Sequence, residues 1–331
     1  RKTLKERKEA EQAERERQSR GNITFAHIFS NIYFPQAINN KDKESCRREQ
    51  DMFKGWISPV IGDIPLKDIS PFHLERIKKN MSDAGLAART IRYALGVVRQ
   101  VYNFSKFNNL FSGEIPTTKV KMPQEDNRRY RYLTHKEAEY LLKSLSLKSR
   151  QMYEIALISL HCGLRAGEIF SLTWGDIYLE KGLMILRDTK SGRNRTTFMT
   201  NAVKEMLESK KRGENDSFIF HGHRAAGINR VSPTFERVIK DLGFNTGVTD
   251  RRQKLVFHSL RHTYASWLVE SGVDLYTVKN LLGHSTIAMT ERYSHLGNNT
   301  LQNAVKVFER SLKGKEEEIT DSSQLGTKKG D

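Results

Sequence analysis

Four side chains between residues 258 and 293 have the types and the spacing of a site that handles an anion. His258 and Arg261 are three residues apart, so they share one face of a helix. His284 follows a Leu-Leu-Gly segment that ends a predicted helix, and Tyr293 lies nine residues further on. Cationic groups gathered around a phenol favour a phosphate as the group being handled. Neither a metal-ligand spacing nor a nucleophile–base triad occurs in this stretch.

Three charged side chains upstream are candidates to complete that site. Arg165 lies in HCGLRAGEIFSLTW, an otherwise apolar segment in which a guanidinium needs a partner, and Glu168 follows at i+3. Lys190 lies in TKSGR, between two β-prone runs, at the turn of a predicted hairpin. Each feature alone also fits an ordinary structural role, but their joint occurrence favours a phosphate site. His262 and Tyr264, on the predicted helix downstream, are interpreted as bystanders.

The chain is strongly basic. Its 331 residues carry 56 Lys and Arg against 39 Asp and Glu, a net charge of +17. This balance is typical of nucleic-acid binders, although ribosomal and membrane-surface proteins share it. No apolar run approaches the roughly 20 residues of a membrane span, and no secretory signal opens the chain. Two cysteines do not make a disulfide framework, so we expect a reducing, cytoplasmic, nucleoid-associated location and no membrane partner.

Changes in composition divide the chain into segments. The first twenty residues are almost all charged or helix-forming, and helical periodicity begins at Ile23. A polar stretch interrupts this pattern near residue 123, and Thr134 with Glu137 forms a capping box that opens the second domain. The predicted divisions are a charged helical linker (1–20), a helical core DNA-binding domain (21–122), an interdomain linker (123–131), a catalytic domain (132–312) and a polar, disordered tail (313–331).

Exposed basic side chains are candidate contacts to a DNA backbone. Three arginines lie on the predicted helix LAARTIRYALGVVRQVYNFSKF, away from its apolar side, and the predicted linker and hairpin carry more. A solvated charged face explains any single one equally well, because phosphate contacts are individually nonspecific. The candidates are Arg89, Arg92, Arg99, Lys119, Lys121, Arg128, Arg193 and Arg195.

The motifs together resemble those of the tyrosine recombinases, the phage integrase family. GLRAGEI is similar to the family's first arginine motif, TKSGR to its lysine hairpin, HSLRHTYAS to its HxxRH box, LLGHS to its second histidine position and TERYSH to its nucleophile segment. The blocks occur in the family's order, and the resemblance covers about residues 20–312. It implies a nucleophile, five further catalytic residues and one supporting acid: Tyr293; Arg165, Lys190, His258, Arg261 and His284; and Glu168.

The resemblance also implies the architecture. We expect a mainly α protein with a small β-hairpin or sheet, in which a helical core-binding domain and a mostly helical catalytic domain clamp duplex DNA. A homotetramer acting on two duplexes is expected, with DNA-bending or directionality proteins as further partners. The charged N-terminal helix favours an additional arm-type DNA-binding domain. One departure is TTFMT after the hairpin, where many members have a proline; it affects the strand end rather than the chemistry.

These residue types suit attack on a phosphodiester. Two arginines can clamp the nonbridging oxygens with forked donors that stay charged. A tyrosine hydroxyl, with a usual pKa near 10, needs a nearby imidazole and cations to become a nucleophile. Lys190 can protonate the leaving 5′-oxygen as a general acid. A 3′-phosphotyrosine conserves the bond energy, so we expect neither ATP nor another cofactor, and no metal ion.

The sequence therefore predicts a site-specific recombinase, an integrase that integrates or excises a phage or other mobile element. A type IB topoisomerase shares the chemistry, but the two-domain layout argues against it. A DNA-binding regulator with an inactive site would not need all six groups. The histidines at 221 and 223 with Cys162 lack a metal-ligand spacing, and there is no Walker A or GxSxG motif.

Overall fold

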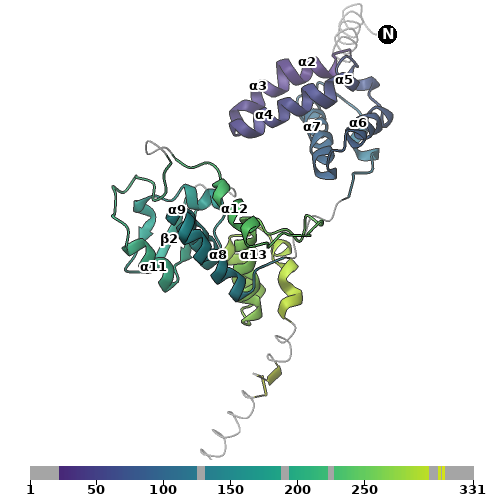
Figure 1. Cartoon of the computed structure of the whole chain (residues 1–331). Helices are drawn as coiled ribbons and strands as arrows, with labels where there is room; N and C mark the ends of the chain where they lie inside the picture. The colour runs from purple at the N-terminus through teal and green to yellow at the C-terminus, as the bar shows by residue number, and fades with distance from the viewer. Residues whose placement is uncertain are drawn as a thin grey trace, which may run out of the picture. The chain divides into compact units, whose positions relative to one another are not determined.

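The computed structural model describes residues 22–124, 131–187, 194–222 and 227–297, together with 305, 306, 308 and 309. The chain divides into two compact units, Arg1–Asp126 and Asn127–Asp331 (Figure 1). The described part is mostly helical, with one small antiparallel sheet in the second unit, which confirms the predicted fold class. The predicted linker 1–20 and tail 313–331 lie outside the described residues, and the predicted domain limits stay predictions. None of the described helices is long and apolar enough to cross a membrane.

The first unit is built from helices around an aromatic and aliphatic core. Residues 25–40 and 43–61 each form a continuous helix whose middle part is a π-helix, followed by Pro35 in one and Pro59 in the other. Proline lacks the N–H of a regular helix, which fits a local change of helical geometry there. The elements are α2 (Phe25–His27), η1 (Ile28–Tyr33), α3 (Phe34–Asn40), α4 (Lys43–Met52), η2 (Phe53–Ile57), α5 (Ser58–Ile61), η3 (Leu66–Asp68), α6 (Pro71–Asp83), α7 (Ala88–Phe107) and η4 (Pro116–Lys119).

Apolar residues from several of these helices meet in one core. The rings of Phe29 and Phe53 stack with centroids 3.8 Å apart. Helix α7 contributes a buried stripe that includes Leu95 and Val98, as its periodicity predicts. Tyr102 is also buried, and its hydroxyl donates to the Leu66 carbonyl at 2.9 Å, which ties α7 to η3. The exposed residues of α7 include three arginines.

The second unit packs around helix α9, which is buried along almost its whole length and lies against α8 and α13. A helix that is apolar all round belongs in a core. The predicted Thr134–Glu137 capping box opens α8, and the predicted break at Gly163 ends α9. The elements are α8 (His135–Lys148), α9 (Arg150–Cys162), α10 (Ala166–Phe170), η5 (Trp174–Asp176), α11 (Asn201–Glu208), α12 (Pro233–Asp241), α13 (His258–Glu270), α14 (Leu275–Leu282), η7 (Ile287–Met289) and η8 (Glu291–Gly297).

A three-stranded antiparallel sheet completes this unit. Its order is β1 (Ile177–Tyr178), β2 (Leu183–Leu186) and β3 (Arg195–Phe198). The predicted hairpin is present as the β2–β3 pair, in a register that sets Leu186 opposite Arg195. Its turn, residues 188–193 with Lys190, lies outside the described residues. Strand β1 is an addition to the predicted hairpin, and the predicted extended segment near Phe218 forms an isolated bridge with Thr173.

Candidate active site

Arg165 is positioned by the junction between two helices. Gly163 ends α9 in the left-handed conformation, with φ 68°, and an added Cβ would lie 2.4 Å from the Tyr264 ring. Arg165 then caps α10, and its side chain remains 30% exposed. Glu168 accepts from Arg165 Nη1 and from the Arg165 backbone N–H, both at 2.8 Å. The predicted Arg165–Glu168 pair is therefore present.

Arg261 lies beneath this pair and is only 2% exposed. Its Nη1 donates to the Gly163 carbonyl and its Nη2 to the Leu282 carbonyl, each at 2.5 Å. Glu168 Oε2 lies 3.8 Å from Nη1. Burial, together with the charge of Arg165, lowers the pKa of Arg261 to about 9, and Glu168 opposes the shift. The guanidinium is thus charged at neutral pH and fixed by two main-chain acceptors.

Arg195 is a third guanidinium beside the same carboxylate. Its Nη2 donates to Glu168 at 3.0 Å and its Nη1 to the Leu281 carbonyl at 2.8 Å. The side chain is 14% exposed, and its Nε has no hydrogen-bond partner in the described part of the chain. The sequence predicted a DNA-backbone contact here. The described contacts of Arg195 are internal, with Glu168 and the end of α14, and the backbone contact stays a prediction.

Three guanidinium groups also explain the charge state of Glu168. Burial raises the pKa of this carboxyl. The charge of Arg195, the backbone N–H of Arg165 and the charge of Arg261 outweigh burial, and the pKa lies below its usual range. One carboxylate against three guanidiniums leaves the site with a net positive charge, which suits a phosphate.

His284 is held at the end of helix α14. Gly283 ends this helix with φ 63°, and an added Cβ would lie 2.4 Å from Arg195 Nε. His284 Nδ1 then lies 2.9 Å from the hydroxyl oxygen of Thr290, which is fully buried. Burial and the charges of Arg261 and Arg165 lower the pKa of His284 to about 3. This imidazole is neutral in the free protein.

Tyr293 is buried against the helix that carries the HxxRH motif. The phenol is 5% exposed, and it packs with apolar residues of α13 and α14. Its hydroxyl oxygen lies 2.5 Å from His262 Nδ1. His262 in turn meets the exposed His258 edge to face, with ring centroids 4.8 Å apart. Burial raises the pKa of Tyr293, and the charges of Arg292 and Arg261 reduce this shift without cancelling it.

The structure places His262, which the sequence interpretation set aside as a bystander, in contact with Tyr293. It lies one helical turn after His258 and directly after Arg261, and its ring contacts the predicted nucleophile. The i,i+4 spacing from His258 was the available signal. The ring of Tyr264 lies against Gly163.

The remaining predicted residues are either exposed or outside the described ranges. Lys190 and Arg193 fall in 188–193 and Arg128 in 125–130, which are not described. The other candidates lie at the surface of the first unit. Of these, Arg99 donates to the Thr117 hydroxyl at 3.2 Å and Lys119 pairs with Glu114 at 2.7 Å, while the rest of the exposed set is Arg89, Arg92 and Lys121.

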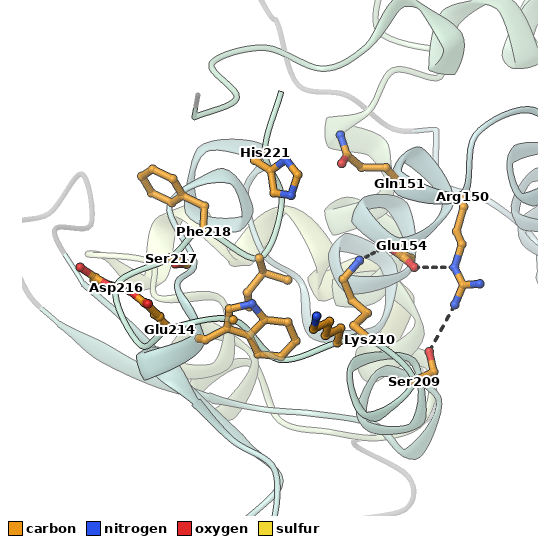
Figure 2. A pocket seen from close by; sticks show the side chains of 14 residues that line it. Arg150, Gln151, Glu154, Ser209, Lys210, Glu214, Asp216, Ser217, Phe218 and His221 are labelled. Carbon is orange, nitrogen blue, oxygen red and sulfur yellow. Dashed lines mark hydrogen bonds and ion pairs between the residues drawn. The ribbon is translucent and has the colours of Figure 1, made fainter. Parts of the chain in front are cut away.

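Three hollows are described in the second unit, and one of about 560 Å³ is lined by His258, among others. A small one of about 210 Å³ is lined by Tyr293 and His262, among others. A larger one of about 920 Å³ contains none of the predicted site residues (Figure 2). Its buried carboxylate, Glu154, accepts from Arg150 at 3.0 Å and from Lys210 at 2.6 Å, so it is neutralised locally. Among the described residues, no group of His, Cys, Asp and Glu is arranged to hold a metal ion.

Comparison with known proteins places this geometry in a family. Residues 131–300 match the phage integrase family, and residues 25–82 match the phage integrase N-terminal SAM-like domain. The tyrosine recombinase XerD of Halalkalibacterium halodurans is 28% identical over 231 residues, which cover 66% of this chain and 74% of the relative. The tyrosine recombinase XerA of Pyrococcus furiosus is 26% identical over 229 residues, 67% of this chain and 75% of the relative.

Solved structures share the fold. The Tn1549 transposon integrase bound to a circular intermediate DNA superposes with a TM-score of 0.68 at 18% identity, covering 82% of this chain and 95% of that chain. A lambda integrase tetramer bound to a Holliday junction gives 0.66 at 18% identity, covering 82% and 77%. The match to the family spans more than half of the sequence and includes every predicted catalytic position. The chain belongs to the phage integrase family, the tyrosine site-specific recombinases.

Proposed function

We propose that this chain is an integrase that cuts and rejoins duplex DNA through a covalent bond between Tyr293 and a 3′-phosphate. The observation that carries the proposal is the grouping of Arg165, Arg261 and Glu168 in the unit that also holds the buried Tyr293. Arg165 is the partly exposed guanidinium, so it is the one that an incoming phosphate meets first. Each Nη of Arg261 carries two hydrogens, so it can bind a phosphate oxygen and keep its carbonyl partner.

The proposed reaction needs only groups of the protein and the DNA. The Tyr293 oxygen forms a bond to phosphorus as the bond to the 5′-oxygen breaks, and Lys190 supplies the proton to that oxygen. The arginines stabilise the charge that develops on the nonbridging oxygens. Attack by a 5′-hydroxyl from another strand reverses the step and completes strand exchange.

Duplex DNA and a second set of protomers are the proposed partners. The Tn1549 integrase was solved on DNA and lambda integrase as a tetramer on a Holliday junction, which supports a homotetramer acting on two duplexes. The exposed arginines of α7 give the first unit a basic surface for the backbone. A clamp of the two units around DNA, DNA-bending or directionality proteins, and a cytoplasmic, nucleoid-associated location complete the proposal.

Strand exchange tests this function. The protein is incubated with a nicked, randomised duplex library, covalent complexes are recovered, and the enriched site is built into two labelled duplexes. An integrase exchanges strands between these duplexes and forms four-way junctions, and Tyr293→Phe abolishes both. Relaxation of supercoiled plasmid without exchange would indicate a topoisomerase, and sequence-specific binding without cleavage would indicate a regulator.

A further inference from the structure

We propose that His262 is the general base for the nucleophile, accepting the phenolic proton of Tyr293 as its oxygen attacks the phosphate. The inference rests on the proposed function, because it concerns how that reaction starts. It concerns a residue outside the set of catalytic positions that the motifs predict.

The contact geometry points to His262. Its Nδ1 lies 2.5 Å from the Tyr293 hydroxyl oxygen, within reach of direct proton transfer. His284 presents its Nδ1 to Thr290 at 2.9 Å.

The surroundings of the phenol make a base necessary. Tyr293 is 5% exposed and His262 7% exposed, so bulk water has little access to the proton. Burial raises the pKa of Tyr293 further from neutrality. A base that touches the hydroxyl lets the proton leave as the oxygen–phosphorus bond forms, without a free phenolate beforehand.

The fold also fixes the position of His262 relative to Arg261, one of the two arginines proposed to bind the phosphate. His262 directly follows Arg261 in α13, and η8, which carries Tyr293, packs against the same helix. The guanidinium is held by the carbonyls of Gly163 and Leu282. The positions of His262, Arg261 and Tyr293 are therefore fixed by α13 and the elements that pack against it.

The proton balance of the step is complete. The Tyr293 proton passes to His262 Nδ1, the oxygen–phosphorus bond forms, and the bond to the 5′-oxygen breaks. Lys190 gives its proton to that leaving oxygen. In the return reaction His262 gives the proton back to the phenol, as microscopic reversibility requires.

Two variants separate proton transfer from positioning. His262→Asn places an amide where Nδ1 lies and keeps a hydrogen bond to the phenol. His262→Gln replaces the ring with a longer amide side chain. Neither amide can take up a proton. Single-turnover cleavage of a nicked site should fall about 100-fold or more in both. His221→Gln, at an exposed histidine that lines the larger hollow, should cleave like the wild type. DNA affinity and melting temperature are measured for all three.

Two chemical substitutions then assign the role. A fluorinated tyrosine at position 293, whose phenol is more acidic, should restore cleavage at least tenfold in His262→Asn but not in Lys190→Ala. A substrate with sulfur in place of the 5′-bridging oxygen, whose leaving group needs no proton, should restore Lys190→Ala but not His262→Asn. Cleavage by His262→Asn within about threefold of the wild type, or its rescue by the sulfur substrate, would overturn the proposal. Absence of any adduct in the wild type would instead overturn the proposed function.

Discussion

Arg195 Nη2 lies 3.0 Å from Glu168 Oε2, so β3, the second strand of the predicted lysine hairpin, is tied to the carboxylate that holds Arg165. The other Nη of Arg195 binds the carbonyl of Leu281, close before His284. One guanidinium thus joins β3, α10 and the end of α14. Arg165 is therefore linked to the end of α14, next to His284, through Glu168 and Arg195.

Replacing Glu168 with glutamine should destabilise the protein and slow cleavage. The side chain is 9% exposed, and removal of its charge leaves three guanidiniums without their shared anion. A loss of about 3 kcal/mol in the free energy of unfolding is expected, measured by urea denaturation. Glu208→Gln, in an exposed i,i+4 pair, should cost less than about 1 kcal/mol.

The stability difference between the wild type and Glu168→Gln should depend on pH. Because the pKa of Glu168 is lowered in the folded protein, its contribution is full above the ordinary value of 4.5 and is lost as the pH falls through the folded pKa. The wild type should therefore lose stability below pH 4.5 more steeply than Glu168→Gln. If the free energy of unfolding fell with pH in the same way in both proteins, ionised Glu168 would not contribute to stability.

Gly283→Ala should slow cleavage by more than the backbone strain of an alanine at this φ would cause. Its φ of 63° costs an alanine about 1 kcal/mol, and the added Cβ would also meet Arg195 Nε at 2.4 Å. Gly272 has a φ of 87° with nothing within 4 Å of an added Cβ, so Gly272→Ala is the matched control. The two variants should differ by at least tenfold in single-turnover cleavage. Equal cleavage rates in Gly283→Ala and Gly272→Ala would mean that displacement of Arg195 does not affect cleavage.

Arg89 and Arg92 should govern DNA affinity, whereas Arg195 should govern the rate of cleavage. Both α7 arginines are exposed, and no hydrogen bond or ion pair is described for either within residues 22–124. The double alanine variant should weaken binding and reduce the slope of log affinity against log salt by about 0.9 for each phosphate that it no longer neutralises. Arg195→Gln, which removes the charge, should leave this slope unchanged and slow cleavage. A reduced salt slope in Arg195→Gln would support the predicted backbone contact of Arg195.

His284 should remain neutral in the free protein throughout the physiological range. Its pKa is lowered from 6.5 to about 3, so the unfolded chain binds the proton more readily between these values. The histidine therefore detracts from stability as the pH falls from 6.5 towards 3, and His284→Gln should flatten that decline. Its imidazole signal in an NMR titration should not move above pH 5. Protonation of His284 near pH 6.5 would contradict its burial beside Arg261 and Arg165.

The sequence predicted those features that depend on local spacing. The Arg165–Glu168 pair, the capping box before α8 and the break at Gly163 each follow from residues a few positions apart. The two glycines before Arg165 and His284 signalled helix ends, but not that Tyr264 and Arg195 pack against them.

The features that sequence reasoning missed depend on contacts between distant segments. Arg195 and Glu168 are 27 positions apart, and His262 and Tyr293 are 31. An arginine after a basic hairpin has the same local pattern whether it faces DNA or a buried carboxylate. Likewise, the i,i+4 spacing of His262 from His258 indicates a shared helix face, but not that η8 brings a phenol to that face.

Identification of the residue that becomes covalently attached to DNA tests the central claim most directly. The protein is trapped on the nicked site recovered from the library, digested with protease, and the peptide that carries the nucleotide is sequenced by mass spectrometry. The adduct should lie on Tyr293 at a 3′-phosphate, should be absent from Tyr293→Phe, and should form normally in Tyr276→Phe, which alters an exposed tyrosine of α14. An adduct on another residue, or one that persists in Tyr293→Phe, would contradict the account.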